Sequence, residues 1–440
     1  MKRVDVITMG CSKNLVDSER LLRRLSDGQI EAVHDADNFE GDAVVINTCG
    51  FIGDAKEESI DMILRACEAK AAGRVGKVYV MGCLSERYAA ELPAEIPEVD
   101  GWFGKFDFEA LVGSLCPALR PSERPWDRTL TTPPWSAYLK IAEGCNRFCA
   151  FCAIPLITGR YKSRPVEEII AEVRKLAGKG VKEFNVIAQD LSYYGRDIYG
   201  RMAIAELVDA MAAVEGVEWI RLHYAYPADF PYDLLPVMAR HGNVCKYLDI
   251  ALQHSADGVL DRMRRHIDGC ETRALLARIR REVPGIHIRT TLMVGFPGET
   301  DADFADLLEF VREERFERMG AFAYCEEDDT YAAVNYTDDV PEEVKQQRLD
   351  KLMALQEEIA LESNESKIGS TMRVLVEREN DDYYIGRSQY DSPEVDPEVL
   401  IAKNSCEEPL AAGCFYEVEI TDAMPFELIA KALHTDVSAG

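Results

Sequence analysis

The stretch AYLKIAEGCNRFCAFC, residues 137–152, joins a strand-like run to three closely spaced cysteines. Residues 137–142 are apolar enough for a buried strand, and Cys145, Cys149 and Cys152 follow with the spacing C-x3-C-x2-C. Three thiolates this close together can hold a metal, but no histidine or further cysteine lies nearby to complete a set of four ligands. The stretch therefore predicts a metal site at the end of a strand, with one ligand missing.

Further strand-like runs follow at intervals along the chain, with helical patterns between them. They lie at 183–188, 219–224, 246–252, 286–294 and 319–324. Together with 137–142 they make six βα units, which predict a partial parallel barrel over residues 135–369. Active sites of such barrels lie at the carboxyl ends of the strands, where the cysteine cluster is expected.

The rest of the chain predicts an α/β protein with two additional domains. Over residues 1–116, the runs 4–9, 42–48 and 77–82 each precede a helical pattern, which indicates an open parallel sheet with covering helices. Residues 117–134 contain five prolines and are expected to form a linker. Residues 370–440 show short alternating strands broken by Gly, Asn and Asp, which predict a small β-barrel.

A second group of cysteines follows the strands of the N-terminal domain. Cys11, Cys49 and Cys83 each come directly after a strand-like run. Because the carboxyl ends of parallel strands share one edge of a sheet, we expect these thiols to converge on a second metal site. The other cysteines are isolated and are expected to be ordinary thiols: Cys67, Cys116, Cys245, Cys270, Cys325, Cys406 and Cys414.

An iron–sulfur cluster explains three thiolates better than a closed metal site does. A cluster of four irons bound by three cysteines leaves one iron open to a small chelating molecule. Zinc held by three cysteines and a distant histidine is an alternative. An electron-transfer protein is another, although electron carriers use closed four-cysteine sites and would leave the barrel unexplained.

Composition favours a soluble protein of the cytoplasm. The chain has 440 residues, 13 cysteines and a net charge of −28. It begins in a strand-like segment rather than a signal region, and we expect no membrane span and reduced thiols. The acidic charge argues against a broad phosphate-binding surface, so we expect no transfer RNA substrate, and it favours a basic partner.

The C-x3-C-x2-C motif, with Phe151 before its last cysteine, resembles the radical S-adenosylmethionine (SAM) family. That resemblance implies that SAM chelates the open iron and is cleaved to a 5′-deoxyadenosyl radical. MGCSKNLVDSE, INTCGFI and MGCLSERY resemble the N-terminal domain of the methylthiotransferases, and the C-terminal strands resemble their TRAM domain. The likeness covers the whole chain and implies two 4Fe–4S clusters.

Several segments resemble the methylthiotransferase branch that modifies a ribosomal protein: CSKNLVDSE, CAIPLITG, IAQDLSYYGRD, LDIALQHSADGVLDRMRR and FAYCEEDDT. The transfer RNA branch more often shows Gln-Met-Asn where this chain has Ser12-Lys13-Asn14. The resemblance implies addition of a methylthio group to the β-carbon of an aspartate in small-subunit ribosomal protein twelve, free or within the ribosomal particle, with an external electron donor. A transfer RNA adenosine methylthiotransferase is the alternative.

Further cofactor contacts are expected at other strand ends. The resemblance implies that Gln189 and Asp190 contact SAM, although a helix-capping turn would explain them equally well. Arg221 lies on the third barrel strand with the same side-chain direction as His223, which is expected to be a polar core residue. Gly295 and Gly298 follow the fifth strand, where glycines allow close approach to adenosine or simply a tight turn.

The C-terminal domain carries 5 basic and 15 acidic residues over 370–440, a net charge of −10. An RNA-binding barrel needs a positive face for phosphates. This barrel is therefore expected to attract a basic protein, unless its charge serves solubility alone.

Overall fold

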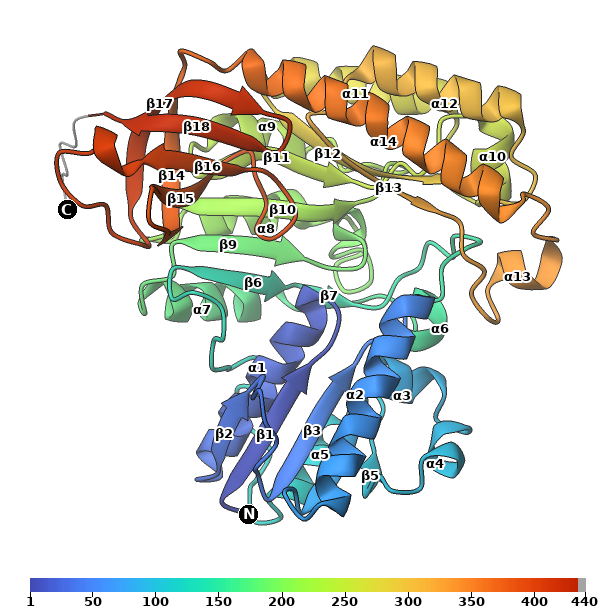
Figure 1. Ribbon diagram of the computed structural model, residues 1–440, viewed down its shortest axis with the longest axis vertical. Helices are drawn as coiled ribbons and strands as arrows, with labels where there is room; N and C mark the ends of the chain where they lie inside the picture. The colour runs from blue at the N-terminus through green and yellow to red at the C-terminus, as the bar shows by residue number, and fades with distance from the viewer. Residues whose placement is uncertain (434–440) are drawn as a thin grey trace.

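The computed structural model describes residues 1–433 and contains three packed parts (Figure 1). The first part is a parallel sheet of order β2-β1-β3-β4-β5. Its strands are β1 (Arg3–Thr8), β2 (Glu31–His34), β3 (Ala43–Thr48), β4 (Lys77–Gly82) and β5 (Gly101–Trp102). Its helices are α1 (Ser12–Asp27), α2 (Gly53–Ala71), α3 (Cys83–Arg87), α4 (Leu92–Glu95) and α5 (Phe108–Leu115). The predicted open α/β fold is confirmed.

Successive side chains of each strand point to opposite faces of this sheet, and each face packs against a layer of helices. Every residue of β3 is buried. Val44 and Ile46 pack in the cluster that contains Ile63 of α2, whereas Val45 packs in the cluster with Leu21 of α1. Successive side chains of a strand point to opposite faces, so a continuous apolar run serves both helix layers.

The two edge strands of this sheet were not predicted. β2 has four residues, all partly or fully exposed, and β5 has two. Short edge strands have little apolar pattern, because one side of each strand faces no neighbour. Pairing with β1 and β4, rather than local sequence, places them in the sheet.

The second part is the predicted partial barrel, and its six parallel strands are confirmed in the order β13-β12-β11-β10-β9-β6. They are β6 (Ser136–Lys140), β9 (Glu183–Ile187), β10 (Trp219–Ala225), β11 (Val244–Ile250), β12 (His287–Val294) and β13 (Arg318–Ala323). A separate hairpin pairs β7 (Ala142–Glu143) with β8 (Lys162–Ser163). Each strand in turn adds to the same edge, so the carboxyl ends all lie at one end of the barrel.

Most helices of this part cover the outside of the barrel, whereas α6 packs against α3 of the first part. The helices are α6 (Ile154–Thr158), α7 (Val166–Ala177), α8 (Ile204–Ala212), α9 (Leu234–Arg240), α10 (Asp257–Arg262), α11 (Gly269–Glu282), α12 (Asp301–Glu314), α13 (Tyr331–Asn335) and α14 (Glu342–Glu365). Figure 1 shows α12 and α14 beside each other along β12 and β13. Phe184, Leu222 and Leu248 from three strands lie in the large apolar cluster that these helices close. Within residues 1–433, no helix is long and apolar enough to cross a membrane.

The proline-containing segment 117–134 has no helix or strand and packs between the first two parts. Its Arg128 is 2% exposed and donates hydrogen bonds to the carboxylates of Glu19 on α1 and Glu172 on α7. A buried arginine shared by two carboxylates fixes its neighbours in place. The segment therefore holds the N-terminal sheet against the barrel.

The third part is a closed barrel of order β14-β15-β16-β18-β17, which confirms the predicted small β-barrel. The strands are β14 (Thr371–Glu379), β15 (Tyr383–Ser388), β16 (Glu398–Ala402), β17 (Phe415–Met424) and β18 (Glu427–Ala432). Figure 1 places it at the amino-terminal ends of the large barrel's strands, opposite their arrowheads. The end of the predicted domain, residues 434–440, lies outside the described residues.

The end of β15 and the loop after it close the amino-terminal end of the large barrel. Arg387 pairs with Glu183 at the start of β9, with a shortest distance of 2.7 Å. Asp391 pairs with Arg318 at 2.6 Å, and all four side chains are at most 4% exposed. The small barrel is therefore part of the large barrel's structure as well as a surface of its own.

Candidate active site

All six cysteines of the two predicted groups line one cavity of about 360 Å³. The N-terminal group, Cys11, Cys49 and Cys83, faces the barrel group, Cys145, Cys149 and Cys152, across the boundary between the first two parts. Cavities of this size are typical of sites for small molecules. The structure thus brings together two thiol triads that are far apart in the sequence.

Sheet topology positions the N-terminal triad. Cys11 is the N-cap of α1 just after β1, Cys49 follows β3, and Cys83 opens α3 after β4. β1, β3 and β4 are adjacent parallel strands. Their carboxyl ends meet at one edge, which is where residues from distant segments converge in parallel sheets.

Close backbone approach at this edge depends on Gly10. Its φ is +84°, and a Cβ atom at this position would lie 2.6 Å from the Cβ of Cys49. A side chain would both strain the backbone and collide with Cys49. Glycine before Cys11 therefore allows two of the three thiols to lie side by side.

The barrel triad lies on a loop that other segments hold in place. The Cys145 N–H donates to the Gly159 carbonyl at 3.1 Å, and the Ala150 N–H donates to the Met263 carbonyl at 2.9 Å. Phe148, between the first two cysteines, has a φ of +50°. Non-glycine residues persist in this left-handed region when their surroundings enforce it, and such residues are concentrated at functional sites.

Cys149 has the most polar surroundings of the three barrel cysteines. Arg265 Nη1 donates to its sulfur at 3.1 Å, and the hydroxyl of Tyr226 lies 3.7 Å away. The guanidinium carbons of Arg147 and Arg265 each lie 4.2 Å from the centre of the Tyr226 ring. Cys149 is therefore the barrel cysteine whose sulfur contacts both a guanidinium and a hydroxyl.

Burial disfavours the anionic form of three of the other thiols. Desolvation raises the pKa of Cys83 to about 12 and that of Cys145 to about 12, and it raises the pKa of Cys152 further. A metal centre supplies the positive charge that would deprotonate such thiols. These buried sulfurs fit metal ligation.

Among residues 1–433, no three His, Cys, Asp or Glu side chains are grouped closely enough to hold one metal ion.

Gln189 is the predicted cofactor contact that the structure brings into the cavity. Its Nε2 donates to Glu143 at 3.4 Å, whereas its buried Oε1 has no hydrogen-bond partner in the described chain. Two further lining residues have a buried atom without a hydrogen-bond partner in the described chain: Gln253 at Oε1 and Arg147 at Nη2. Buried polar atoms are normally paired, so these three atoms are available to a polar ligand.

The other four predicted contacts do not line the cavity. Asp190 lies beneath it and accepts a hydrogen bond from Arg147 at 2.6 Å. Arg221 is buried toward the small barrel, where it pairs with Glu183 at 3.1 Å. Gly295 and Gly298 face the side chains of Lys345 and Arg262. Asp190 thus contacts the site only through Arg147. Arg221, Gly295 and Gly298 contact other residues away from the cavity.

The cavity is positive, which the sequence did not indicate. Among residues 1–433, its lining includes four cations and neither Asp nor Glu: Lys13, Lys105, Arg147 and Arg265. Arg147 lies inside the cysteine motif and Lys13 lies beside Cys11, but nothing local marks the other two. In a chain of net charge −28, this concentration of positive charge distinguishes the site from the remaining surface.

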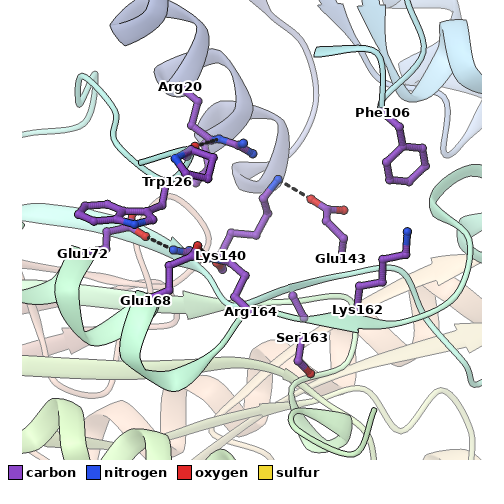
Figure 2. Close-up of a pocket in the computed structure, with 13 residues that line it drawn as sticks. Arg20, Phe106, Trp126, Lys140, Glu143, Lys162, Ser163, Arg164, Glu168 and Glu172 are labelled. Atoms are coloured by element: carbon purple, nitrogen blue, oxygen red, sulfur yellow. Dashed lines mark hydrogen bonds and ion pairs between the residues drawn. The ribbon is translucent and has the colours of Figure 1, made fainter. Parts of the chain in front are cut away.

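A second cavity of about 310 Å³ lies at the same domain boundary and contains none of the six cysteines. Figure 2 shows its lining, where Lys140 approaches Glu143 and Arg164 approaches Glu172. Trp126 of the linker lies beside these residues. Since these lysine–glutamate and arginine–glutamate pairs fill it, we assign this cavity to the contact between domains.

Three family models match the chain. The radical SAM superfamily matches residues 139–311, an uncharacterized protein family named UPF0004 matches residues 3–104, and the TRAM domain matches residues 368–433. The three matches fall on the large barrel, the N-terminal sheet and the small barrel.

Curated relatives match over nearly the full length. A protein of Parabacteroides distasonis named ribosomal protein uS12 methylthiotransferase RimO is 58% identical over 432 residues, which cover 98% of this chain and 99% of the relative. A protein of the same name from Phocaeicola vulgatus is 59% identical over 435 residues, which cover 98% of this chain and 100% of the relative.

A solved structure with a similar fold is the radical S-adenosylmethionine methyltransferase TsrM of Kitasatospora setae. It has a TM-score of 0.56 and 13% identity, and the match covers 76% of this chain and 74% of that one. At this identity the likeness concerns the fold alone.

Proposed function

The chain belongs to the RimO family of radical SAM methylthiotransferases, and from this we propose that it adds a methylthio group to an aspartate of ribosomal protein uS12. The aspartate β-carbon carries unactivated C–H bonds, which acid–base chemistry does not readily break. Family membership implies SAM and a 4Fe–4S cluster, which when bound supply the one-electron chemistry needed to break such a bond.

We assign the two thiol triads to two clusters. Cys145, Cys149 and Cys152 would hold the one that binds SAM at its open iron, with Gln189 and Gln253 offering free amide oxygens to the cofactor. Cys11, Cys49 and Cys83 would hold the second. The observation that carries the proposal is that both triads face one cavity, so a substrate carbon between them can be reached from either side.

The chain's own residues would shape the cavity and exclude water. Phe51, Phe151 and Ile154 supply apolar lining, and Phe151 is supported by an edge-to-face contact with Phe296 at 6.4 Å between ring centres. Arg147 is held by Asp190 and lies against Tyr226. A dry, preorganised site protects reactive intermediates and strengthens electrostatic interactions.

Iron analysis tests the two-cluster assignment. We expect about eight irons per chain after anaerobic reconstitution. Cys49→Ala should lose about half of them and keep reductive SAM cleavage, whereas Cys149→Ala should abolish 5′-deoxyadenosine formation. Cys67→Ala is the matched control, because Cys67 is a buried thiol of α2 outside the cavity. Unchanged iron in Cys49→Ala would overturn the second cluster.

Mass spectrometry of products tests the substrate. The enzyme, SAM, a sulfur source and a reductant are incubated with uS12 or the small ribosomal subunit, and separately with transfer RNA. We expect the methylthio adduct on the protein and none on the nucleosides. The opposite result would establish the transfer RNA alternative.

The acidic small barrel supports a basic protein substrate in the cytoplasm, where ribosomes are made. Its net charge of −10 would attract such a partner. Asp381 and Asp382 are exposed at the β14–β15 turn, but Glu377 is paired with the buried Arg387 at 2.7 Å. Charge reversal at Asp381 and Asp382 should therefore weaken association, whereas reversal at Glu377 would disturb the fold.

A further inference from the structure

Lys13 differs from the other three cations of the cavity in its partners. Lys105 pairs with Asp17 at 3.2 Å, and Arg147 pairs with Asp190 at 2.6 Å. Arg265 donates to the sulfur of Cys149. Lys13 forms no ion pair within residues 1–433, and its Nζ lies 3.6 Å from the centre of the Tyr224 ring. It is the cavity's cation that has neither an acidic nor a thiol hydrogen-bonding partner in the described chain.

The position of Lys13 spans the two halves of the site. It follows Cys11 at the start of α1, whereas Tyr224 belongs to β10 of the large barrel. Tyr224 has a φ of +64°, so its ring is presented from a backbone conformation that the surroundings enforce. The ring holds the ammonium by a cation–π contact, which is weaker than an ion pair and leaves all its N–H donors without a carboxylate.

An aspartate substrate needs a counter-charge in this place. Its carboxylate is attached directly to the β-carbon that reacts, so both must enter the cavity together. Moving a carboxylate out of water is costly unless a cation receives it. No Asp or Glu among residues 1–433 lines the cavity to compete for Lys13.

We propose that Lys13 is the specificity-determining residue that receives the side-chain carboxylate of the substrate aspartate. The inference rests on the proposed function and extends it to the group that selects the amino acid. When the substrate binds, the ammonium pairs with the carboxylate, with or without loss of its contact with the Tyr224 ring. This ion pair orients the β-carbon between the two triads.

The test compares Lys13→Met and Lys13→Arg with wild type. Methionine keeps the length of the side chain and removes its charge, whereas arginine keeps the charge. Lys77→Met is the matched control, because Lys77 is an exposed lysine of β4 in the N-terminal part whose Nζ lies 6.0 Å from a tyrosine ring, away from the cavity. Each variant is loaded with clusters and titrated with fluorescent uS12, and with uS12 in which the target Asp is Asn.

We expect the dissociation constant for uS12 to rise about tenfold in Lys13→Met, the scale of one charge-assisted hydrogen bond. The constant for the Asn form should be the same in Lys13→Met and wild type. Lys13→Arg should recover most of the affinity, and Lys77→Met should behave as wild type. Methylthiolation should fall through KM more than through kcat.

Two results would overturn the inference while leaving the proposed function intact. One is equal binding of uS12 by wild type and Lys13→Met. The other is loss of iron or of SAM affinity in Lys13→Met, which would assign the lysine to the neighbouring Cys11 site or to the cofactor. Failure of wild type to modify uS12 would instead remove the proposed substrate, and this inference with it.

Discussion

Arg265 is the residue whose charge is most closely tied to the barrel thiols. It is 2% exposed, donates to Cys149 and to a backbone carbonyl, and forms no ion pair within residues 1–433. Its positive charge should favour the reduced state of a cluster held by Cys149. We expect Arg265→Gln to lower the reduction potential of that cluster by about 60 mV, the equivalent of one charged hydrogen bond.

Redox titration followed by electron paramagnetic resonance measures this shift, with iron content as a check on cluster loading. Arg264→Gln is the control, since Arg264 is the half-buried neighbour that lies over the Tyr331 ring. Equal potentials in both variants would show that Arg265 serves packing alone.

Lys367 predicts a pH dependence of stability. Burial, and next the charge of Arg318, lower its pKa to about 8 from an ordinary value of 10.5. The folded protein therefore binds the proton of the Lys367 amine less tightly than the unfolded chain does. This difference destabilises the fold to its full extent below pH 8, and the destabilisation disappears as the pH approaches 10.5. Lys367→Met should raise the free energy of unfolding at pH 7 by up to about 3 kcal/mol, with the gain fading across that window.

Urea denaturation between pH 7 and pH 10.5 measures this effect. Lys351→Met provides the control, because Lys351 is exposed on the neighbouring helix α14. A constant difference between Lys367→Met and wild type over the whole range would contradict the assignment of the shift to Lys367.

The chemistry of single residues was predictable where it coincided with a pattern. Cysteines after strands could be recognised because sheet topology fixes where strand ends meet. Arg265 and Lys105 could not, because their places depend on loops whose courses no local pattern specifies. Arg221 has the right strand for a cofactor contact, but its side chain pairs with Glu183 from the next strand and approaches the small barrel.

Elements of secondary structure show the same division between local pattern and tertiary pairing. The strands of the large barrel other than β13 are largely buried and are followed by helices, so their sequences identify them. In the small barrel, β16 and β18 are five and six residues long. They are neighbours in the barrel and pair in parallel, although β17 lies between them in the sequence, so the pattern of either strand does not reveal this pairing.

The β15 strand contains the arginine that joins two barrels. Arg387 donates to Glu183 and Glu377, and its side chain is 2% exposed. Removing one partner of a buried pair leaves the other charged and unpaired. Arg387→Met should lower the free energy of unfolding by about 3–5 kcal/mol.

Arg378→Met is the matched control for that measurement, made by thermal and urea denaturation. Arg378 pairs with Glu398 on the same small barrel, but the two side chains are 54% and 34% exposed. Its loss should cost no more than about 1 kcal/mol. Similar losses in the two variants would argue against a structural role of the buried network.

At the scale of the whole molecule, ion pairs determine how the two triads face each other. Glu327, after β13, accepts hydrogen bonds from Lys56 of α2 at 3.0 Å and from Arg87 of α3 at 2.8 Å. We expect Glu327→Ala to loosen the N-terminal sheet, which carries one triad. Methylthio product should fall at least about tenfold while SAM cleavage continues, because misplacement of reacting groups is costly even over short distances.

Product and 5′-deoxyadenosine are quantified in the same reaction by mass spectrometry. Glu326→Ala controls for charge, since Glu326 is the exposed neighbour. Parallel loss of both products in Glu327→Ala would place the effect in the barrel rather than in the contact between domains.

The small barrel cannot be removed to test partner docking alone. Truncation before Ser370 would leave Glu183, Arg221 and Arg318 without partners that the structure supplies from residues 387–391. Loss of activity in such a fragment would report instability as well as lost docking. Substitutions at Asp381 and Asp382 avoid this difficulty, because both are exposed.

The pairing of Glu183 with Arg387 also affects the order in which the protein folds during synthesis. Translation produces the carboxylate long before the guanidinium, so the amino-terminal end of the large barrel lacks this partner in a nascent chain until β15 has been made. Folding at this end of the large barrel is therefore coupled to folding of the small barrel.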